Sequence, residues 1–322
     1  MHKGDEQEPG ASALVIGESL VDVILDAEGR RSVHPGGSPL NVAVGLGRLG
    51  LPTQLATCIG RDPNGDLVRG HLAEAGVAVH SGSSASDRTA TSRATLDADG
   101  SATYEFDVEW QLEEFWTGDP LLVHTGSLAT ILDPGASNVE SMLGSLSPSV
   151  LVTFDPNIRP SLTPSREAAR RQTEGFASLA HVVKMSEEDA SWLYPGRSRN
   201  AIAEQYASLG VTLFVLTRAE RGCSVASGDV FRDIPAEPAG VADTVGAGDA
   251  FMSGLIYEII RSEGIEKLIT RRADREFIET CARTALRSAA ITVSRPGANP
   301  PSRHELDAFG DLVDQSNAPA TW

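Results

Sequence analysis

From about residue 120 onward, short apolar runs alternate with longer segments in which apolar residues recur at helical spacing. Short apolar runs are typical of buried strands, and the helical spacing is typical of amphipathic helices. Strands are predicted over residues 121–125, 150–154, 181–185 and 212–217, with a late antiparallel pair over residues 223–226 and 230–234, and helices are predicted over residues 137–146, 166–180, 200–208 and 270–290. This alternation predicts an α/β fold with a mostly parallel sheet that helices cover on both faces.

The N-terminal third has a different pattern, because two of its segments show the half-polar composition of strands exposed on one face. After a buried strand over residues 13–17, the first segment covers residues 18–34, with turn residues at 26–30. The second segment covers residues 89–107 and has an Asp-Gly turn signal near its middle. We expect these two hairpins to form a small sheet that projects from the main body as a lid and excludes water from a site.

A helix is predicted from Ser38 to Leu49, with Ser38 as its N-cap and Pro39 in the first helical position, and a strand is predicted over residues 53–59. Gly36 and Gly37 precede this helix and expose backbone beside its start, which suits a polar ligand. A tight turn has the same composition, so the glycine pair alone leaves both interpretations open.

The end of this helix spells G-x-G-x-x-G over residues 45–50. A dinucleotide-binding fingerprint follows a strand and opens a helix, whereas this one lies in a helix that has already begun. We therefore interpret Gly45 and Gly47 as small residues that pack closely against the sheet, and we expect no nicotinamide cofactor there.

The stretch from Val241 to Phe251 carries two carboxylates, Asp243 and Asp249, with small residues between them. We interpret it as a loop that opens a helix. Gly246 and Gly248 let the backbone approach a ligand, and the N–H groups at a helix start favour an anion such as a transferring phosphoryl group. A carboxylate at the same point can accept a proton from an attacking hydroxyl. The structural alternative is a helix capped by Asp after a glycine turn.

Three further polar segments follow predicted strands, and they cover residues 155–159, 186–189 and 217–222. Ligands of open α/β sheets bind beyond the carboxyl ends of the strands. We therefore expect these segments and the stretch around Asp249 to share one site.

Composition excludes several classes of protein. The chain has 322 residues, 41% apolar and 22% charged, and its net charge of −17 argues against a nucleic-acid binder. Three scattered cysteines argue against a disulfide framework and a structural zinc site. No apolar run approaches the roughly 20 residues that span a bilayer, and residues 1–12 lack the features of a secretory signal. We expect a cytoplasmic protein with flexible tails at residues 1–12 and 316–322.

The chain has no Walker-type phosphate loop and no serine nucleophile elbow. The stretch from Val241 to Phe251, however, closely resembles the C-terminal signature of the ribokinase-like (PfkB) sugar kinases. Residues 36–43, Gly-Gly-Ser-Pro-Leu-Asn-Val-Ala, resemble the first signature of that family. The resemblance extends in the right order from Val15 to about Leu306. It implies an α/β ribokinase-like three-layer sandwich over residues 13–310, with a mostly parallel central sheet and a small β-sheet lid.

The resemblance also implies catalytic roles for particular residues. Asp249 matches the general base that removes the proton of a sugar hydroxyl. Gly246, Ala247 and Gly248 match the anion hole that stabilises the transferring γ-phosphoryl group, which fits a reaction governed by positioning and charge stabilisation.

On the sugar side, Asp22, Gly36, Gly37 and Asn41 match family positions that hold sugar hydroxyls. Strand statistics alone favour a solvent-facing Asp22, so here the resemblance changes the interpretation. Arg159 contacts the substrate or a phosphate, or else it braces a neighbouring carboxylate, Asp155, or a helix end.

On the nucleotide side, Ser186 and Asp189 match the family's N-x-x-E element, which organises Mg²⁺ and phosphate through water. Here Ser replaces Asn and Asp replaces Glu. Thr217 and Gly222 match a nucleotide-loop motif, T-x-G-x-x-G, in which Ala219 replaces the middle glycine. Gly246 and Gly248 complete the implied nucleotide contacts.

The family often binds a monovalent cation beside the anion hole. By resemblance, a cation such as K⁺ is held here by groups near the following five residues: Asp243, Val245, Thr292, Arg295 and Gly297.

Residues 17–22 and 154–160 look most like those of fructokinases, and 2-keto-3-deoxygluconate kinases share much of the pattern. The resemblance implies an ATP-dependent kinase that phosphorylates a primary sugar hydroxyl, with fructose as the first candidate. Ketodeoxygluconate, ribose and nucleosides are the alternative acceptors, and a nonenzymatic sugar-binding regulator is the alternative from another class. We expect ATP, Mg²⁺ and a sugar as ligands, no nucleic-acid or membrane partner, and a lid able to pair two subunits as a homodimer.

Overall fold

The computed structural model describes residues 13–25, 30–96, 102–115 and 117–316 of the chain. The predicted N-terminal tail and residues 317–322 of the predicted C-terminal tail lie outside the described residues. So do residues 26–29 and 97–101, which carry the two predicted hairpin turns.

A nine-stranded sheet forms the middle layer of the molecule, in the order β15-β14-β13-β12-β11-β10-β1-β4-β6. Its strands are β1 (Ala13–Ile16), β4 (Thr53–Ala56), β6 (Val77–Val79), β10 (Leu122–Gly126), β11 (Leu151–Asp155), β12 (Val182–Ser186), β13 (Leu213–Thr217), β14 (Cys223–Ser227) and β15 (Val230–Ile234). Every neighbouring pair is parallel except the two pairs that β14 makes with β13 and β15. The prediction of a mostly parallel sheet with a late antiparallel pair is confirmed.

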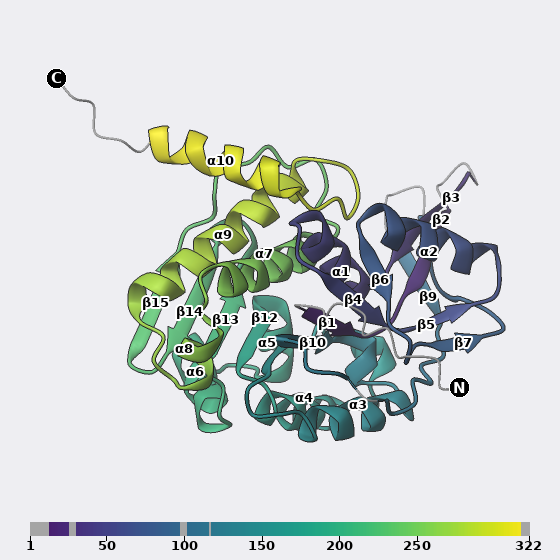
Figure 1. Cartoon of the computed structure of the whole chain (residues 1–322), viewed down its shortest axis with the longest axis horizontal. Coiled ribbons are helices and arrows are strands. Elements are labelled where there is room, and N and C mark those ends of the chain that lie inside the picture. The colour runs from purple at the N-terminus through teal and green to yellow at the C-terminus, as the bar shows by residue number, and fades with distance from the viewer. Residues whose placement is uncertain (1–12, 26–29, 97–101, 116, 317–322) are drawn as a thin grey trace, which may run out of the picture.

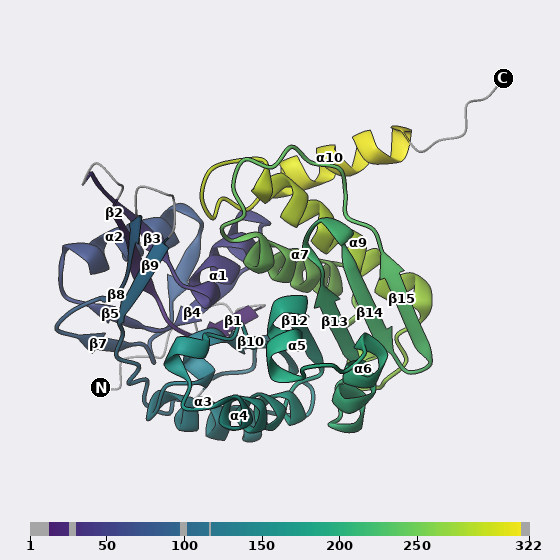
Figure 2. The ribbon, with the colours of Figure 1, turned by 180° about the vertical axis from the view of Figure 1, so that it is seen from behind.

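Helices cover both faces of this sheet, so the fold has three layers (Figures 1 and 2). One layer contains α1 (Ser38–Arg48), α2 (Pro63–Glu74), α7 (Ala247–Arg261), α8 (Ile265–Ile269) and α9 (Arg275–Val293), with α10 (Arg303–Ser316) packed outside α9. The other contains α3 (Gly135–Gly144), α4 (Arg166–Ser178), α5 (Glu187–Leu193) and α6 (Arg199–Ser208). Short 3₁₀ turns occupy Ser127–Thr130, Pro160–Leu162 and Ala219–Arg221.

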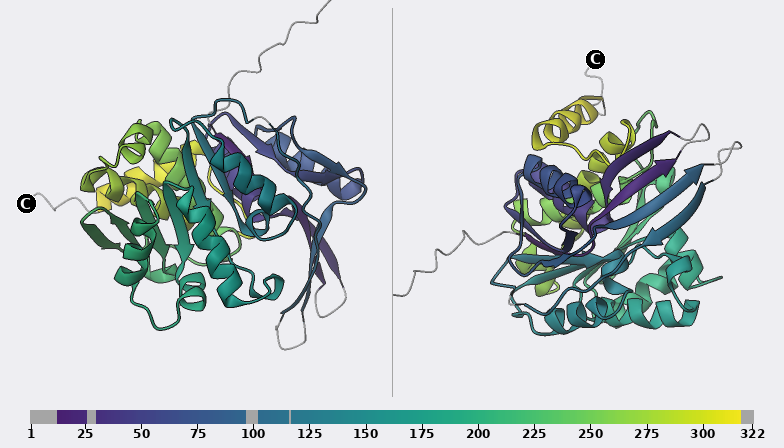
Figure 3. Two further views of the ribbon diagram at one scale, coloured as in Figure 1. Left: turned by 90° about the horizontal axis from the view of Figure 1, so that it is seen from below. Right: turned by 90° about the vertical axis from the view of Figure 1, so that its right-hand side faces the viewer.

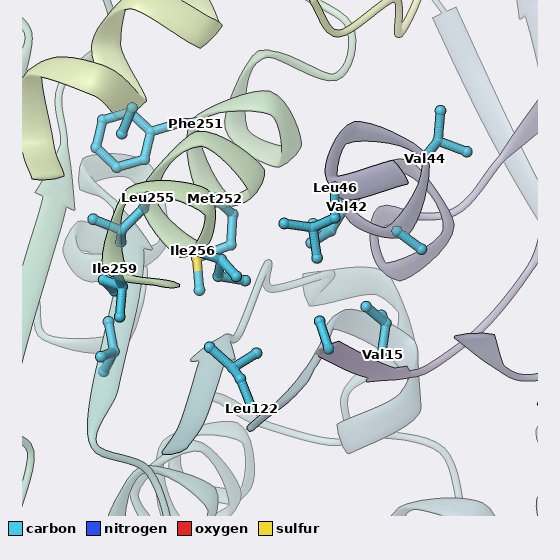
Figure 4. Close-up of a cluster of buried hydrophobic side chains, with 14 of the residues drawn as sticks. Val15, Val42, Val44, Leu46, Leu122, Phe251, Met252, Leu255, Ile256 and Ile259 are labelled. Atoms are coloured by element: carbon cyan, nitrogen blue, oxygen red, sulfur yellow. The ribbon is translucent and has the colours of Figure 1, made fainter. Parts of the chain in front are cut away.

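The central strands are apolar on both faces because each face has its own core. Along β1, Ala13 and Val15 pack in the cluster under α1 and α7, whereas Leu14 and Ile16 pack in the cluster over α3 and α4. Figure 4 shows the first cluster, in which side chains of α1 and α7 meet above Val15 and a β10 leucine. This two-sided burial explains why these strands appear in the sequence as continuous apolar runs.

A second, four-stranded sheet projects from the edge of the main body (Figure 3) and is called the small sheet below. Its order is β3-β2-β8-β9, from β2 (Leu20–Leu25), β3 (Arg31–Gly36), β8 (Ala90–Leu96) and β9 (Ala102–Asp107). Both predicted hairpins form, and their inner strands β2 and β8 join in parallel. Val21 and Val23 turn inward to the core, so the intervening Asp22 faces the other side of the small sheet.

Two helix starts differ from the prediction. Ser38 is not the N-cap of α1; Gly37 holds that position at φ 106°, and the Ser38 hydroxyl is committed to a distant carboxylate instead. The helix predicted over residues 270–290 begins at Arg275, because Asp274 caps it by accepting a hydrogen bond from the Phe277 amide.

Two further elements also differ. The strand predicted over residues 53–59 is broken at Thr57 into β4 and β5 (Cys58–Gly60), and β5 pairs with β7 (Ser84–Ser86). The break lets the Thr57 hydroxyl donate to Ser19 at 2.9 Å. Helix α10 was not predicted from the sequence pattern.

The glycines of residues 45–50 serve packing, and Gly47 packs against the sheet as predicted, because a Cβ atom there would lie 2.8 Å from a methyl group of Val77 on β6. A Cβ atom on Gly45 would lie 2.3 Å from the Ser253 hydroxyl of α7. A Cβ atom on Gly47 would lie 2.3 Å from the Ala75 carbonyl oxygen at the end of α2. These contacts allow α1 to pack closely against two helices. In the described part of the chain, none of the helices combines the length and apolar character that crossing a bilayer requires.

Candidate active site

The polar segments that are predicted to share one site do lie together, along the edge of the nine-stranded sheet that is formed by the carboxyl ends of its parallel strands. Asp155, Ser186 and Thr217 are the last residues of the neighbouring parallel strands β11, β12 and β13. The first turn of α7 approaches this edge, since a Cβ atom on Gly248 would lie 2.9 Å from the ammonium nitrogen of Lys184 on β12.

Asp249 lies in the first turn of α7 and is held by two residues of α1. The Ser38 hydroxyl donates to Asp249 Oδ1 at 2.6 Å, and the Asn41 amide nitrogen donates to Oδ2 at 2.8 Å. Burial raises the pKa of Asp249 to about 6, against the opposing effects of these hydrogen bonds and of the Lys184 charge. A carboxylate with such a pKa is ionised at neutral pH and is a stronger base than an exposed one.

The backbone around Asp249 is shaped to receive an anion. Gly246 is the N-cap of α7 at φ 74°, and a Cβ atom there would lie 2.6 Å from the Cβ atom of Ala298. Ala247 and Gly248 form the first helical positions. The Ala247 N–H donates to the Thr244 carbonyl oxygen at 3.3 Å, whereas the Gly248 N–H lies in the first turn, where the helix itself supplies no partner. The alternative of a helix capped by Asp is wrong, because no side chain caps α7.

Asp22 and the glycine pair form a second wall of the site, built from the small sheet. Asp22 lies opposite His34 on β3 and Ser92 on β8. Burial raises the pKa of Asp22, partly offset by a hydrogen bond from Ser92. A Cβ atom on Gly36 would lie 2.1 Å from Asp22 Oδ2, and one on Gly37 would lie 2.7 Å from a backbone carbonyl, so both positions require glycine.

Arg159 is exposed on the loop after β11, and its charge acts on carboxylates from both walls of the site. It lowers the pKa of Asp22 on the small sheet and of Asp189 on α5, although burial dominates both shifts. Among the described residues no hydrogen bond or ion pair joins Arg159 to Asp155, because Asp155 Oδ2 pairs with Lys184 and its Oδ1 atom has no partner.

The Lys184–Asp155 pair is the main feature that the sequence interpretation missed. Lys184 Nζ lies 2.8 Å from Asp155 Oδ2, and the two side chains are 6% and 2% exposed. The available signal was a lone charge within an apolar strand, because such a charge needs a buried partner. Asp155, at the end of the neighbouring strand, was the obvious candidate.

Ser186 and Asp189 are arranged by the start of α5. The Ser186 hydroxyl accepts a hydrogen bond from the Asp189 amide at 2.9 Å and so caps the helix. The Asp189 carboxylate accepts from the Ile158 amide at 3.1 Å, and burial raises its pKa to about 6. Among the described residues no cluster of three or more His, Cys, Asp or Glu side chains is arranged to hold a metal.

The segment after β13 turns sharply. Gly222 has φ 84°, and a Cβ atom there would lie 2.0 Å from the Ile234 carbonyl oxygen. Ala219, where the family's motif has a glycine, still adopts a left-handed φ of 49°. Glycine adopts this conformation at no steric cost, so the alanine holds it with some strain. The Thr217 hydroxyl lies 3.4 Å from the Met185 carbonyl oxygen.

Asp243 joins the loop before α7 to the turn after α9. Its carboxylate accepts from the amides of Val245 at 3.0 Å and Gly297 at 2.8 Å, and these hydrogen bonds lower its pKa. Thr292, near the end of α9, donates its hydroxyl to Ser288. The guanidinium of Arg295, in the same turn, pairs with Glu305 at 3.0 Å. The Arg295 amide donates to the Thr292 carbonyl oxygen at 3.2 Å, and the Asp243 amide donates to the Val293 carbonyl oxygen at 3.2 Å, so the loop and the turn that carry the five residues lie side by side.

The sequence of the chain matches one family of known proteins. The family description "pfkB family carbohydrate kinase" matches residues 11–305. A fructokinase from Salmonella typhimurium is 31% identical over 301 residues, covering 89% of this chain and 96% of that protein.

Similar solved structures agree with this result. Fructokinase from Xylella fastidiosa with bound ATP is 26% identical with a TM-score of 0.83, covering 95% of this chain and 100% of that one. Fructokinase from Vibrio cholerae O395, bound to fructose, ADP and calcium ion, is 25% identical with a TM-score of 0.77, covering 93% of this chain and 99% of that one. The chain therefore belongs to the pfkB family of carbohydrate kinases.

Proposed function

We propose that this protein transfers the γ-phosphoryl group of ATP to a primary hydroxyl of fructose. The observation that carries the proposal is the position of Asp249, an ionisable base in the first turn of α7, beside the glycines of an anion-binding helix start. The choice of fructose is supported by the similarity to the Salmonella, Xylella and Vibrio fructokinases.

In the proposed reaction, fructose lies between the small sheet and the start of α7. Asp22 accepts hydrogen bonds from sugar hydroxyls, and the Asn41 amide donates to a sugar hydroxyl. Gly36 and Gly37 leave room for the sugar ring. Asp249 accepts the proton of the attacking hydroxyl as the new P–O bond forms. The N–H groups at the start of α7 stabilise the charge on the transferring phosphoryl group, and ADP leaves.

ATP is proposed to lie along the carboxyl ends of β12 and β13, with its phosphates directed at Gly246 and Gly248. Ser186, Thr217 and Gly222 form the nearby wall. The donor set fits Mg²⁺, because Asp189 offers a carboxylate and the phosphates of ATP supply further oxygen ligands. Bound Mg²⁺ would neutralise phosphate charge during transfer. Asp189 would hold it through water.

A monovalent cation such as K⁺ is proposed beside the anion hole. The loop before α7 and the turn after α9 supply carbonyl oxygens, and Asp243 ties these two segments together through Val245 and Gly297. Hard oxygen donors of this kind suit an alkali cation. The cation would add positive charge behind the helix start without touching the sugar.

One substrate panel tests the proposed function. Purified protein is given ATP and Mg²⁺ with fructose, glucose, ribose, 2-keto-3-deoxygluconate or a nucleoside, and ADP release is measured. We expect the highest kcat/KM with fructose, and loss of turnover in Asp249→Asn with ATP and fructose binding retained in calorimetry. A higher kcat/KM with another acceptor would reassign the substrate. Binding of fructose without any turnover would favour the nonenzymatic regulator.

We also propose that the small sheet pairs two subunits. Its outer strands β3 and β9 are edge strands, and such edges offer unpaired backbone groups to a second chain. Sedimentation velocity is expected to show a dimer. A monomer at micromolar concentration would contradict this proposal and leave the kinase assignment untouched.

A further inference from the structure

The Lys184–Asp155 ion pair lies directly beneath the anion-binding start of α7. Lys184 comes from β12 and Asp155 from the end of β11, and Nζ lies 2.8 Å from Oδ2. On its other side, the ammonium group lies so near Gly248 that a Cβ atom there would approach it to 2.9 Å. One buried cation therefore pairs with the end of β11 and also lies close beside the first turn of α7.

Structural stability is a weak explanation for this pair. Buried ion pairs often contribute less than apolar residues of the same volume, because both charges must lose their hydration. Asp155 is also only half satisfied, since its buried Oδ1 atom has no hydrogen-bond partner among the described residues. A buried polar atom without a partner is rare in native proteins and calls for an explanation.

The charges around Lys184 indicate what the pair can do. Three carboxylates act on it electrostatically: Asp155 on β11, Asp249 on α7 and Asp189 on α5. Burial lowers the pKa of Lys184, but these three carboxylates together more than reverse this effect, so the group stays charged. His124 on β10, whose pKa falls to about 3 through burial and the nearby ammonium, adds no positive charge at neutral pH.

We propose that Lys184 is a positioning residue of the phosphoryl-transfer site, which fixes the Gly248 backbone and keeps the Asp249 base ionised. Asp155 anchors the ammonium group so that its charge faces the helix start. This inference rests on the proposed kinase function. It assigns a role to two residues outside the set of groups that contact sugar or nucleotide.

Two single substitutions with opposite expected effects test the proposal. Asp249 faces Lys184 from β12, Asp155 from β11 and the uncharged side chains of Ser38 and Asn41 from α1. Lys184→Met removes the attractive charge, so the acid limb of kcat/KM is expected to move to higher pH. Asp155→Asn removes the repulsive charge, while Asp249 and Asp189 remain as counter-charges of the ammonium group, so that limb is expected to move to lower pH.

A double variant separates positioning from folding. Lys184→Met/Asp155→Asn removes both charges, so its stability is expected to lie close to that of the wild type. Its kcat is nevertheless expected to fall about 10- to 100-fold, comparable to the loss of part of an oxyanion hole. The KM values for sugar and ATP should change much less, because Lys184 contacts neither ligand.

The matched control is Glu258→Gln on the same helix, α7. Glu258 is also buried and accepts hydrogen bonds from Arg261 and Thr284, but it lies at the far end of the helix from Asp249. The Glu258→Gln variant is expected to be less stable than the wild type, with the acid limb of kcat/KM at the same pH. The proposal would be overturned if the acid limb of kcat/KM stayed at the wild-type pH in both single variants, or if the double variant kept the full kcat.

A readout independent of turnover keeps the two proposals separate. The carboxyl band of Asp249 is titrated by infrared difference spectroscopy in the free protein, with Asp249→Asn as the reference lacking that band. Opposite shifts in Lys184→Met and Asp155→Asn support the role of Lys184 even if no sugar is phosphorylated. Equal shifts of the Asp249 titration midpoint in the two variants would reject that role even if fructose is a good substrate.

Discussion

At the scale of single residues, the site depends on one carboxylate whose surroundings make it a base near neutrality. Asp249 acts only when ionised, and burial raises its pKa to about 6. We therefore expect kcat/KM for the sugar to rise with pH through about 6 and then to level off. A pH–rate profile with saturating ATP measures this limb. Activity that increases on acidification below this range would contradict the assignment of Asp249 as the base.

Glu18, between β1 and β2, is a second carboxyl group with a raised pKa. It is buried and accepts from the Ala129 amide at 3.1 Å, and burial raises its pKa from 4.5 to about 7. The protonated form therefore stabilises the fold below about pH 4.5, and this contribution is lost as pH rises through about 7. The shift corresponds to about 3 kcal/mol at most.

Glu18→Gln should consequently gain stability relative to the wild type between about pH 5 and about pH 8. Urea unfolding at both pH values measures the difference. The control is Glu279→Gln, because a hydrogen bond from Arg275 lowers the pKa of Glu279, so its ionised form is the stabilising one. That variant should show no such gain. If the unfolding free energies of Glu18→Gln and the wild type differed by the same amount at both pH values, ionising Glu18 in the folded protein would cost little free energy.

Residue roles could be predicted from the sequence where a motif fixed them and not where tertiary contacts did. The matches at Asp249 and Asn41 placed both residues in one site, and the structure brings them within hydrogen-bond distance. Ser38 was misread as an N-cap because Ser before Pro is a common helix start. Its true partner is 211 positions away in sequence, and no local pattern encodes that contact.

At the scale of elements, the start of α7 depends on the shape of Gly246. This residue has φ 74°, and a Cβ atom would lie 2.6 Å from the Ala298 side chain. Gly246→Ala is therefore expected to lower stability by about 1–3 kcal/mol and kcat by on the order of 100-fold. Gly144→Ala is the control, since a Cβ atom at this end of α3 meets no atom within 4 Å. Normal turnover in Gly246→Ala would show that the helix start tolerates displacement.

The small sheet is anchored to the main body at the start of α2. Asp62 caps this helix by accepting from the Gly65 amide at 2.8 Å, and it also accepts from the amide and hydroxyl of Thr89, which precedes β8. Asp62→Ala should lower the unfolding free energy by about 2–3 kcal/mol and raise the KM for sugar more than the KM for ATP.

Asp274→Ala is the matched control for this anchor, because Asp274 caps α9 through the Phe277 amide alone. It should cost about 1 kcal/mol and leave both KM values unchanged. Equal effects of the two substitutions on the KM for sugar would show that the Asp62–Thr89 contact does not position the small sheet.

Most elements could be predicted because their signals are local. The apolar runs of β10 to β13 and the spacing of the helices between them depend on burial alone. The parallel pairing of β2 with β8 could not be predicted in the same way, since about 65 residues and several elements separate these strands. The same limit applies to the break at Thr57, which serves a contact with Ser19.

At the scale of the whole molecule, the proposed sugar site spans two bodies of structure. Asp22 belongs to the small sheet, whereas Asn41 and Asp249 belong to helices of the main body. A ligand that contacts both should stabilise their native arrangement by mass action. ATP, in contrast, is proposed to contact only the main body.

This difference predicts separable thermal shifts. Fructose at about 100 times its Kd should stabilise the protein by about 2.7 kcal/mol, which corresponds to several degrees in Tm. Asp22→Ala should abolish the shift caused by fructose and keep the shift caused by Mg–ATP, because only the sugar wall is altered. Asp249→Asn should keep both shifts, since an amide there can still pair with Ser38 and Asn41. Loss of the Mg–ATP shift in Asp22→Ala would mean that the small sheet contacts the nucleotide, and the sugar would then have to lie elsewhere.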